Sequence, residues 1–514
     1  MIQKQFKKGR VILSLLFFVL IIVSFADIKG NIPAGYFKTV LYLQFIPSLL
    51  KLITPGTIIS LGAIFVIILT FAGGRVYCST ICPLGVMQDI IIFVKRKISS
   101  KKRLKFKKAL NLIRYPILVL GIVSLFFGGI LFFNWLDPYA NFGRIGAHII
   151  QPVILGVNNL IAKILPSVGL MPLEARPFHF ASFAFAAGVF LLVGIMSFFS
   201  GRLYCNTVCP VGTLLGLLSK VSLFKIRIDA SSCTKCGKCQ AACKANCINI
   251  KTLEVDETRC VSCFNCIPVC EDSSIKYKLS SKLKTQPAIA ADNTDSKRRF
   301  LMVSAVGYLT AKSVSVFGAE EKNHVCFWRR GTVAPPGSLS IEHLKDRCVS
   351  CHLCISVCPT KVLQPSWLEY GVTGMLMPKM DFMHNFCNYE CTKCGEVCPT
   401  GAIIHLPPEE KKLTQIGKVQ FVQDDCIVET EGTSCGSCSE HCPTQAVKMV
   451  PYKNGLTIPE TDTSICIGCG ACEYACPVKD PHKAIFVASS LVHARAEKPK
   501  SEKIEYEETE EFPF

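Results

Sequence analysis

The chain has 514 residues, of which 30 are cysteine and half are hydrophobic. Its mean hydropathy of +0.37 excludes an ordinary soluble enzyme, and its length excludes a small disulfide scaffold. The formal net charge of +19 does not indicate nucleic-acid binding, because the densest basic run, Lys95–Lys108, lies between apolar stretches. Six thiolate-bound [4Fe–4S] clusters, at about −2 each, would lower that charge to about +7.

The first part of the chain predicts four membrane-spanning helices. The basic residues before the first span and the Lys95–Lys108 loop predict that the amino terminus and this loop lie in the cytoplasm. The loop 137–180 is then expected outside, and the segment 41–53, which is short and contains Pro47, is expected to be interfacial or re-entrant. The predicted spans are Val11–Ala26, Thr57–Ala72, Tyr115–Trp135 and Ala181–Ser200.

An internal repeat follows spans two and four. Each copy reads Gly-Arg-x-Tyr-Cys-x3-Cys-Pro, with cysteines at Cys78 and Cys82 and at Cys205 and Cys209. This spacing places both sulfurs on one face of a helical turn. Two matched cysteine pairs in one chain make it a poor interpretation that these are merely buried free thiols. Two interpretations stay open: the four cysteines bind a metal centre, or they form two redox-active dithiols that face each other. Arg75 and Arg202, next to the pairs, are further redox candidates that could also stabilise a negative cluster or cap the spans.

Two complete cysteine quartets then form C-x2-C-x2-C-x3-C. This spacing is typical of bacterial ferredoxins, in which the first three cysteines hold one cluster and the fourth reaches the other cluster. The usual proline after the fourth cysteine is replaced by Lys244 and Glu271, and Cys247 is left as a spare thiol. The predicted ligands are Cys233, Cys236, Cys239 with Cys270, and Cys260, Cys263, Cys266 with Cys243.

The stretch from Ser296 to Ala319 divides the chain into two halves. Its basic head (297–299) and its short apolar run resemble a twin-arginine export signal, with Lys297 in place of the first arginine. The alternative is a linker that stays in the cytoplasm. Phe317 is too large for the usual small-x-small cleavage pattern before Ala319, so we expect an uncleaved anchor.

Four further quartets follow this stretch. Soft thiolates select iron–sulfur clusters or zinc, and tight cysteine triplets favour iron over zinc sites or disulfides. His352 completes a formal C-x-x-C-H haem motif, but both its cysteines belong to a quartet; Cys326 lies outside every quartet. The quartets are Cys348, Cys351, Cys354 and Cys358; Cys387, Cys391, Cys394 and Cys398; Cys426, Cys435, Cys438 and Cys442; and Cys466, Cys469, Cys472 and Cys476.

The half before the signal-like stretch resembles the NapH-type ferredoxin-like membrane proteins of periplasmic nitrate reductase systems. The half after it, including Ala334-Pro335-Pro336-Gly337, resembles NapG. The resemblance implies a quinol dehydrogenase with a periplasmic cytochrome or terminal reductase as acceptor. It also implies a nested sharing of ligands. The four ligand sets that this pairing implies are Cys348, Cys351, Cys354 with Cys476; Cys466, Cys469, Cys472 with Cys358; Cys387, Cys391, Cys394 with Cys442; and Cys426, Cys435, Cys438 with Cys398.

The predicted fold class is mixed: a polytopic α-helical membrane domain, with four spans plus a signal-like fifth segment, and two ferredoxin-like α+β iron–sulfur domains. We expect the membrane domain at residues 1–228, a cytoplasmic two-cluster domain at 229–280, a linker and signal at 281–320, a four-cluster domain at 321–490 and an acidic tail at 491–514. The predicted location is the bacterial inner membrane, with residues 321–514 in the periplasm.

The predicted function is to pass electrons from (mena)quinol through six [4Fe–4S] clusters to a periplasmic reductase. Two alternatives remain: a non-catalytic electron-transfer subunit, and a maturation or regulatory redox protein. Quinol oxidation releases protons and needs an acceptor. The candidate acceptors, each of which could also be structural, are Asp89, Asp137, His148, Glu174 and His179.

Overall fold

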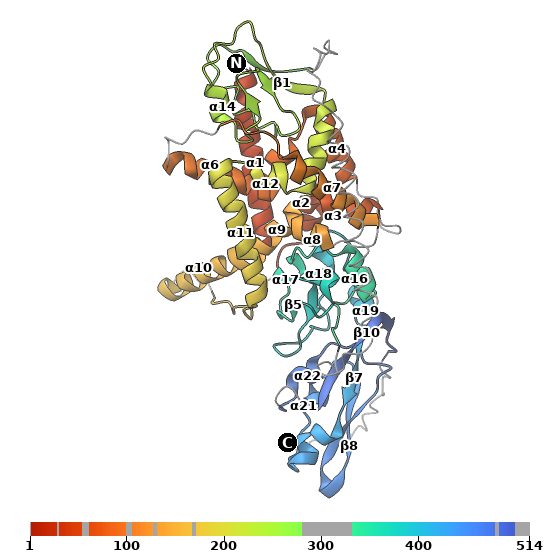
Figure 1. Cartoon of the computed structure of the whole chain (residues 1–514). Helices are drawn as coiled ribbons and strands as arrows, with labels where there is room; N and C mark the ends of the chain where they lie inside the picture. The colour runs from red at the N-terminus through yellow and green to blue at the C-terminus, as the bar shows by residue number, and fades with distance from the viewer. Residues whose placement is uncertain are drawn as a thin grey trace.

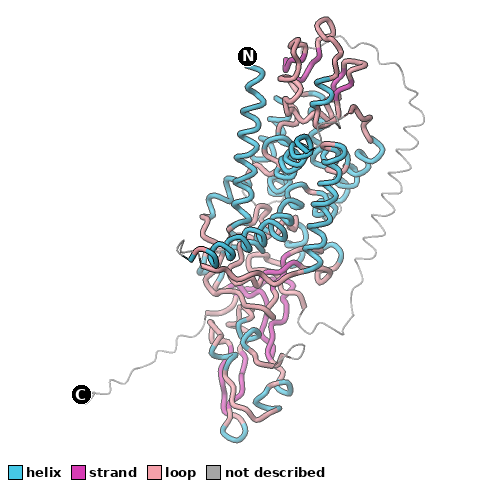
Figure 2. The backbone as a smooth tube through the Cα atoms, turned by 90° about the vertical axis from the view of Figure 1, so that its left-hand side faces the viewer, coloured by secondary structure: helices cyan, strands magenta, loops and turns pink. Residues whose placement is uncertain are grey.

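The computed structural model describes an elongated molecule with three parts along its length (Figure 1). Helices fill the middle, and most strands lie towards the two ends (Figure 2). The described residues are 2–27, 30–53, 61–98, 105–126, 131–166, 171–279, 331–478 and 483–498. The predicted export signal, Cys326 and the acidic tail after residue 498 therefore lie outside the described residues.

The middle part is a helical domain of long and short helices. Its short helices lie between the long ones, and many join at sharp turns marked by proline or glycine, such as Pro83 and Gly201. Its helices are α1 Ile2–Ala26, α2 Ala34–Leu41, α3 Phe45–Ile53, α4 Gly62–Gly73, α5 Tyr77–Thr80, α6 Pro83–Ile98, α7 Asn111–Phe126, α8 Leu131–Leu136, α9 Pro138–Ile145, the π-helix η1 Gly146–Ile150, α10 Gln151–Ile164, α11 Phe180–Ser200, α12 Leu203–Thr207, α13 Pro210–Leu218 and the 3-10 helix η3 Ser219–Val221.

Three helical stretches of the described residues are long and apolar enough to cross a membrane: Gln5–Ala26, Pro138–Ile164 and Phe180–Ser200. The first and the last coincide with predicted spans. Within the predicted second span, residues 62–72 belong to α4, and within the predicted third span α7 and α8 cover residues 115–126 and 131–135. Residues 57–60 and 127–130 of these two spans lie outside the described residues, so the four-span count stays a prediction.

The stretch Pro138–Ile164 lies in the loop that the sequence places outside. Its second half, α10, runs across the direction of α1 and α11 (Figure 1). Val153, Leu160 and Ile164 on α10 are 57% to 64% exposed. A helix with an exposed apolar face that lies across the spans fits the membrane interface better than a crossing segment.

The first cluster module, residues 224–279, lies at the end of the molecule where α1 begins (Figure 1). Its first strand pairs with its last, and a short hairpin lies between them; all pairs are antiparallel. The module begins at Phe224, a few residues before the expected boundary. Its elements are β1 Phe224–Ile228, α14 Lys238–Ala242, β2 Ile248–Asn249, β3 Glu254–Val255 and β4 Ile275–Leu279.

The second cluster module, residues 331–411, and the third, residues 414–495, follow one another at the opposite end (Figure 1). The third repeats the strand pattern of the first, since β7 pairs with β10 around the hairpin β8–β9. Their elements are α16 Ile341–Arg347, α17 Leu353–Ser356, β5 Leu363–Pro365, η4 Val372–Gly374, β6 Pro378–Met380, α18 Lys393–Val397 and α19 Pro408–Lys411, then β7 Thr414–Phe421, η5 Gln423–Asp425, α20 Ile427–Thr430, α21 Ser437–Glu440, β8 Val447–Pro451, η6 Lys453–Gly455, β9 Thr457–Thr461, α22 Ala471–Ala475 and β10 Ile485–Arg495.

One continuous core joins the helical domain to the first and second modules, whereas most of the third module has cores of its own. The second module meets the helical domain at α9. There a Cβ atom on Gly143 would lie 2.3 Å from the carbonyl oxygen of Cys351, so the two backbones touch at a position that only glycine allows.

Gly143→Ala is therefore expected to weaken the contact between the helical domain and the second module. The added methyl group must displace the Cys351 backbone, at a cost of about 1–3 kcal/mol. Thermal unfolding and limited proteolysis of the purified chain would measure the loss. Gly156→Ala on α10 is the matched control, because nothing lies within 4 Å of the Cβ position there. Equal stability of the two variants would contradict the tight contact.

Candidate functional site

Four of the six quartets share one backbone conformation. In each tight cysteine triplet, the residue before the second cysteine and the residue after it both have positive φ, as at Ser350 (50°) and His352 (62°). Left-handed residues on both sides of a cysteine curl the chain and turn its N–H groups inward. The Ser350 N–H accordingly donates to the Cys348 sulfur at 3.4 Å. The other pairs are Lys235 and Gly237, Ser262 and Phe264, and Gly468 and Gly470.

The first module contains two cavities, each lined by one set of four cysteines. Site 1 is lined by Cys233, Cys236, Cys239 and Cys270, and site 2 by Cys243, Cys260, Cys263 and Cys266. This is the exchange of the fourth ligand that the sequence predicts. Site 1 faces solvent at Cys236, whereas site 2 is buried towards the helical domain.

Cys247 also lines site 2. Its sulfur lies 3.5 Å from that of Cys243, and its side chain is 1% exposed. The sequence leaves this thiol as a spare. In the structure it is a fifth sulfur beside the four expected ligands.

The second and third modules each contain one clearly formed cavity of the same kind. Site 4 is lined by Cys358 together with Cys387, Cys391 and Cys394. Site 6 is lined by Cys476 together with Cys426, Cys435 and Cys438. In both sites the fourth cysteine comes from the other quartet of the same module.

The remaining quartets form sites 3 and 5 in the same way. Burial raises the pKa of the Cys354 thiol, and its neighbours Cys351, Cys348 and Cys398 raise it further. Burial likewise raises the pKa of Cys472, with contributions from Cys469, Cys466 and Cys442. Sites 4 and 6 account for the other eight quartet cysteines of these two modules, so we assign Cys348, Cys351, Cys354 and Cys398 to site 3 and Cys442, Cys466, Cys469 and Cys472 to site 5.

The nested pairing taken from the resemblance is wrong for this chain. Each fourth cysteine is shared with the neighbouring quartet in sequence, as in the first module, so two ordinary two-cluster modules follow one another. Local sharing closes short loops, which costs less chain entropy than a nested arrangement spanning the whole domain. The stretched gaps after Cys387 and Cys426 hide this regularity in the sequence.

The six quartets fit iron–sulfur clusters better than single metal ions or disulfides. Every cysteine in the described ranges is a free thiol. Within the same ranges, no group of three or more His, Cys, Asp or Glu side chains is spaced for one metal ion. Four cysteines around a cavity match a core of several irons and sulfides. Bound clusters would supply one-electron carriers.

The four cysteines of the repeat come together in the helical domain as a further group, the four-thiol site. Cys78, Cys82, Cys205 and Cys209 are 2% to 3% exposed and belong to one buried cluster. Hydrogen bonds join the two copies of the repeat. Arg75 donates to the carbonyl oxygen of Cys205 at 3.1 Å, and Arg202 donates to the carbonyl oxygen of Cys78 at 2.5 Å.

A buried ion cluster connects this site to the first module. Asp89 pairs with Arg10 (2.9 Å), Arg202 (2.8 Å) and Lys244 (3.0 Å). Burial alone would raise the pKa of Asp89, but the charges of Arg202, Lys244 and Arg10 outweigh it and hold the pKa well below its usual range. Asp89 is therefore held as an anion by three cations and ties the helical domain to the first module.

The four proton-acceptor candidates of the loop 137–180 separate into two groups. Glu174 is 93% exposed and pairs with Lys361, and His179 caps α11 by accepting from Ser182. Asp137 and His148 are instead close to site 3. Asp137 caps α9 by accepting from the Ala140 N–H, and the His148 ring contacts the His352 ring at 2.7 Å.

His352 was expected to be incidental, yet it lies in the interface. Its second ring nitrogen contacts the carbonyl oxygen of Leu376 at 2.7 Å, so both nitrogens have protein partners. Gln151 and Arg176 of the helical domain donate to the carbonyl oxygen of Ser356 nearby. The haem interpretation gains no support from this geometry.

Polar atoms without partners gather in α8 and α9, beneath site 3. They include Asp137 Oδ1, Asn141 Oδ1 and Arg144 Nη1, together with both side-chain polar atoms of Asn134. Buried polar atoms are normally satisfied, so such a group marks a place that binds something polar. The sequence signals only Asp137; no pattern singles out the neutral Asn134 and Asn141.

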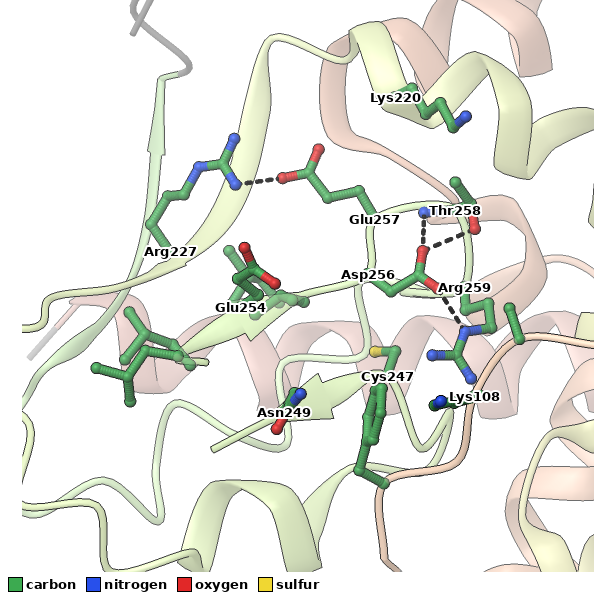
Figure 3. A pocket seen from close by; sticks show the side chains of 16 residues that line it. Lys108, Lys220, Arg227, Cys247, Asn249, Glu254, Asp256, Glu257, Thr258 and Arg259 are labelled. Carbon is green, nitrogen blue, oxygen red and sulfur yellow. Dashed lines mark hydrogen bonds and ion pairs between the residues drawn. The ribbon is translucent and has the colours of Figure 1, made fainter. Parts of the chain in front are cut away.

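A cavity of about 580 Å³ lies elsewhere, between the first module and the loop 106–109. Figure 3 shows that two of its acidic residues are held by neighbours: Asp256 lies between Thr258 and Arg259, and Glu257 faces Arg227. A third acidic residue, Glu254, also lines the cavity.

Family models match three parts of the chain. A model described as a 4Fe-4S binding domain matches residues 55–101 and 179–229, which carry the two repeat motifs. Two models described as 4Fe-4S dicluster domains match residues 347–403 and 433–479. The dicluster matches agree with the local pairing in the second and third modules.

Three relatives illustrate the similarity. Ferredoxin-type protein NapF of Escherichia coli K12 is 28% identical over 29% of this chain and 85% of its own length. NapG of the same strain is 26% identical over 37% of this chain and 86% of its own length. NapH of Haemophilus influenzae is 26% identical over 35% of this chain and 52% of its own length. No solved structure matches. The chain thus combines 4Fe-4S binding domains with candidate membrane helices and has ferredoxin-type homologues named NapF, NapG and NapH.

Proposed function

We propose that the chain is a membrane-bound quinol dehydrogenase that passes electrons from quinol to an acceptor outside the cytoplasmic membrane. The observation that carries the proposal is the order of the cysteine sites. Site 3 touches the helical domain through Cys351 and Gly143, and the Cys387 N–H of site 4 donates to the carbonyl oxygen of Cys469 of site 5 at 2.9 Å. Sites 3 to 6 therefore form a series leading away from the membrane.

The proposed topology places the first module in the cytoplasm and the other two outside. The basic loop supports it, because Lys107 N–H donates to Asn246 of the first module and Arg259 donates to the carbonyl oxygen of Lys107. Positive loops stay in the cytoplasm. The second and third modules lie at the opposite end of the helical domain (Figure 1).

The proposed quinol site is the group of unpartnered polar atoms in α8 and α9. A quinol head group presents two hydroxyls, which Asn134 and Asn141 can bind through their free amide atoms. The free Oδ1 of Asp137 is placed to accept a proton, and Tyr139, which is 1% exposed, lies between this group and Cys351. Oxidation releases two protons and two electrons, and the electrons enter at site 3.

The test is reduction of the purified full chain, in nanodiscs, by a water-soluble menaquinol analogue. We expect bleaching of the cluster absorbance in the wild type and at least about 100-fold slower reduction in Asp137→Asn, which loses the proton acceptor. Glu174→Gln is the matched control, because this exposed carboxylate lies away from the unpartnered polar atoms of α8 and α9. The clusters of this variant should be reduced at the wild-type rate.

The same measurement distinguishes the alternative functions. If isolated chain takes electrons from dithionite but not from the quinol analogue, a partner performs the quinone chemistry and the chain is a passive electron-transfer subunit. In either case, the electron acceptor is a one-electron carrier protein that contacts the third module.

A further inference from the structure

Each copy of the repeat carries a tyrosine whose role the cysteine sites leave unexplained. Tyr77 precedes Cys78 in the first copy, and Tyr204 precedes Cys205 in the second. Both tyrosine side chains are buried. Because a buried tyrosine hydroxyl group needs a hydrogen-bond partner, the partners of these two hydroxyl groups indicate what the tyrosines do.

The hydroxyl group of Tyr204 fixes the side chain of Asn141. It accepts a hydrogen bond from Asn141 Nδ2 at 3.2 Å and donates to the carbonyl oxygen of Leu136 at 3.1 Å. Asn141 Nδ2 also donates to the carbonyl oxygen of Trp135 at 2.9 Å, so both protons of the amide nitrogen are used. Asn141 Oδ1, an acceptor, is left without a partner among the described residues.

The hydroxyl group of Tyr77 fixes Gln44 in the opposite sense. It accepts from the Phe45 N–H at 3.2 Å and donates to Gln44 Oε1 at 3.5 Å. Gln44 is fully buried just before α3, in the segment 41–53 that the sequence predicts to be interfacial or re-entrant. Its Nε2, a donor, has no partner within the described part of the chain. A buried amide with an unpaired donor is costly unless a polar group binds it.

The two amides belong to one region, next to Asp137 and site 3. Asp137 is close enough for its charge to act on the hydroxyl groups of both tyrosines. The charge of Cys398 likewise acts on Lys51 of α3 and on Tyr139 of α9. In Figure 1, α3, α8 and α9 lie at the end of the helical domain that faces the second module. The segment before α3 thus adjoins the same site as α8 and α9.

Together the two amides offer one free acceptor and one free donor. One quinol hydroxyl group can donate to Asn141 Oδ1, and the oxygen of the other hydroxyl group can accept from Gln44 Nε2. After oxidation both oxygens are carbonyl oxygens, which only accept. The bond from Gln44 then persists, whereas Asn141 Oδ1 faces another acceptor and its bond is lost. Such a pair distinguishes the reduced head group from the oxidised one.

We propose that Gln44 completes the quinol site and that Tyr77 and Tyr204 are its positioning residues, an inference that rests on the proposed quinol reaction. Tyr77 holds the Gln44 amide so that its donor is free for the head group, and Tyr204 holds Asn141 so that its acceptor is free. Neither tyrosine takes up the protons of the quinol, because both hydroxyl groups already have protein partners on each side. The duplicated motif thus supplies one positioning tyrosine for each hydroxyl group of a quinol.

The first test separates binding from chemistry in Tyr77→Phe and Tyr204→Phe, which keep the ring and lose only the hydroxyl group. The measurement is the rate of cluster reduction in nanodiscs against the concentration of the menaquinol analogue. We expect the half-saturating concentration (KM) to rise about 5- to 10-fold in each variant, as for the loss of one hydrogen bond. The maximal rate (kcat) should stay within about 2-fold of wild type, because Asp137 and site 3 are unchanged. A wild-type KM in both variants, or a lower kcat at constant KM, would overturn the positioning role.

The second test measures binding of the oxidised analogue by titration calorimetry. Tyr77→Phe should weaken this binding about 5- to 10-fold, because the Gln44 donor also serves a carbonyl oxygen. Tyr204→Phe should bind the oxidised analogue as tightly as wild type does, since Asn141 Oδ1 has no bond to lose in that state. Equal weakening in the two variants, or weakening in neither, would contradict the assignment of donor and acceptor.

A double-mutant cycle determines whether Tyr77 acts through Gln44. Gln44→Leu removes the free donor at a similar side-chain volume, so KM should rise at least about 10-fold. Adding Tyr77→Phe should raise KM no further, because the hydroxyl group then has no amide to hold. Two effects that multiply would make Tyr77 a structural residue only. If Gln44→Leu lacks clusters that dithionite can bleach, calorimetry of the two single tyrosine variants decides instead.

Tyr277→Phe is the matched control. Its hydroxyl group donates to the carbonyl oxygen of Gly73 at 3.0 Å, but it lies in the first module, at the other end of the helical domain (Figure 1). Its KM and its binding of the oxidised analogue should equal those of wild type. Failure of the proposed function has a different signature: wild type binds the oxidised analogue, yet its clusters are not reduced by the quinol. The calorimetric comparison then still judges the two tyrosines, and no binding by wild type would overturn both proposals.

Discussion

Cys398→Ala is expected to remove the iron of site 3 and to stop quinol-dependent reduction of sites 4 to 6. Cys398 shares site 3 with Cys348, Cys351 and Cys354, and site 3 is the site that touches the helical domain. Loss of one thiolate ligand typically costs the cluster, so iron should fall by about four atoms per chain. Iron analysis and cluster absorbance after addition of the quinol analogue are the measurements.

The comparison variant is Cys476→Ala. Cys476 lines site 6, so this variant should lose the same amount of iron while sites 3 to 5 still accept electrons. The nested pairing predicts the reverse, with Cys476→Ala emptying site 3. Cys247→Ala, which removes a buried thiol outside every quartet, should leave the iron content unchanged.

Asp89→Ala is expected to destabilise the junction between the helical domain and the first module by about 3–5 kcal/mol. The change leaves Arg10, Arg202 and Lys244 buried without their shared anion. Thermal unfolding in detergent should show the loss, and limited proteolysis should release the first module earlier. Asp229→Ala is the control, since Asp229 is exposed and its carboxylate accepts hydrogen bonds from nearby Ser231.

The same carboxylate gives a pH dependence with a defined sign. Because the folded-state pKa of Asp89 lies below its usual value, its contribution is present above the unfolded pKa, near 4, and is lost as pH falls through the folded value. The difference in stability between wild type and Asp89→Asn should therefore be constant from neutral pH to about pH 5 and shrink below about pH 4. A difference that grows on acidification would contradict the ion cluster.

The sequence predicts the cysteine sites well because ligand spacing is a local property. The triplets at Cys233, Cys260, Cys348 and Cys466 each carry their loop conformation within seven residues, and the loops appear where the motif predicts them. The order in which quartets share a fourth ligand depends on how strands such as β7 and β10 pair, which is not local. The resemblance supplied that order, and the structure corrects it.

The membrane part is harder to predict for a related reason. Apolar composition locates α1 and α11, and it places the end of the second span at Ala72, one residue before α4 ends at Gly73. The grouping of Arg75, Arg202 and Asp89 around the four-thiol site joins residues more than a hundred positions apart. The roles of Asn134 and Asn141 follow from burial alone, and sequence does not report burial of a polar side chain.

The most direct test of the account is the iron and acid-labile sulfide content of the intact, anaerobically purified chain. Six [4Fe–4S] sites predict about 24 iron and about 24 sulfide per chain. Metal content near zero, or zinc in place of iron, would contradict the assignment of the cysteine sites and, with it, the electron path from the membrane.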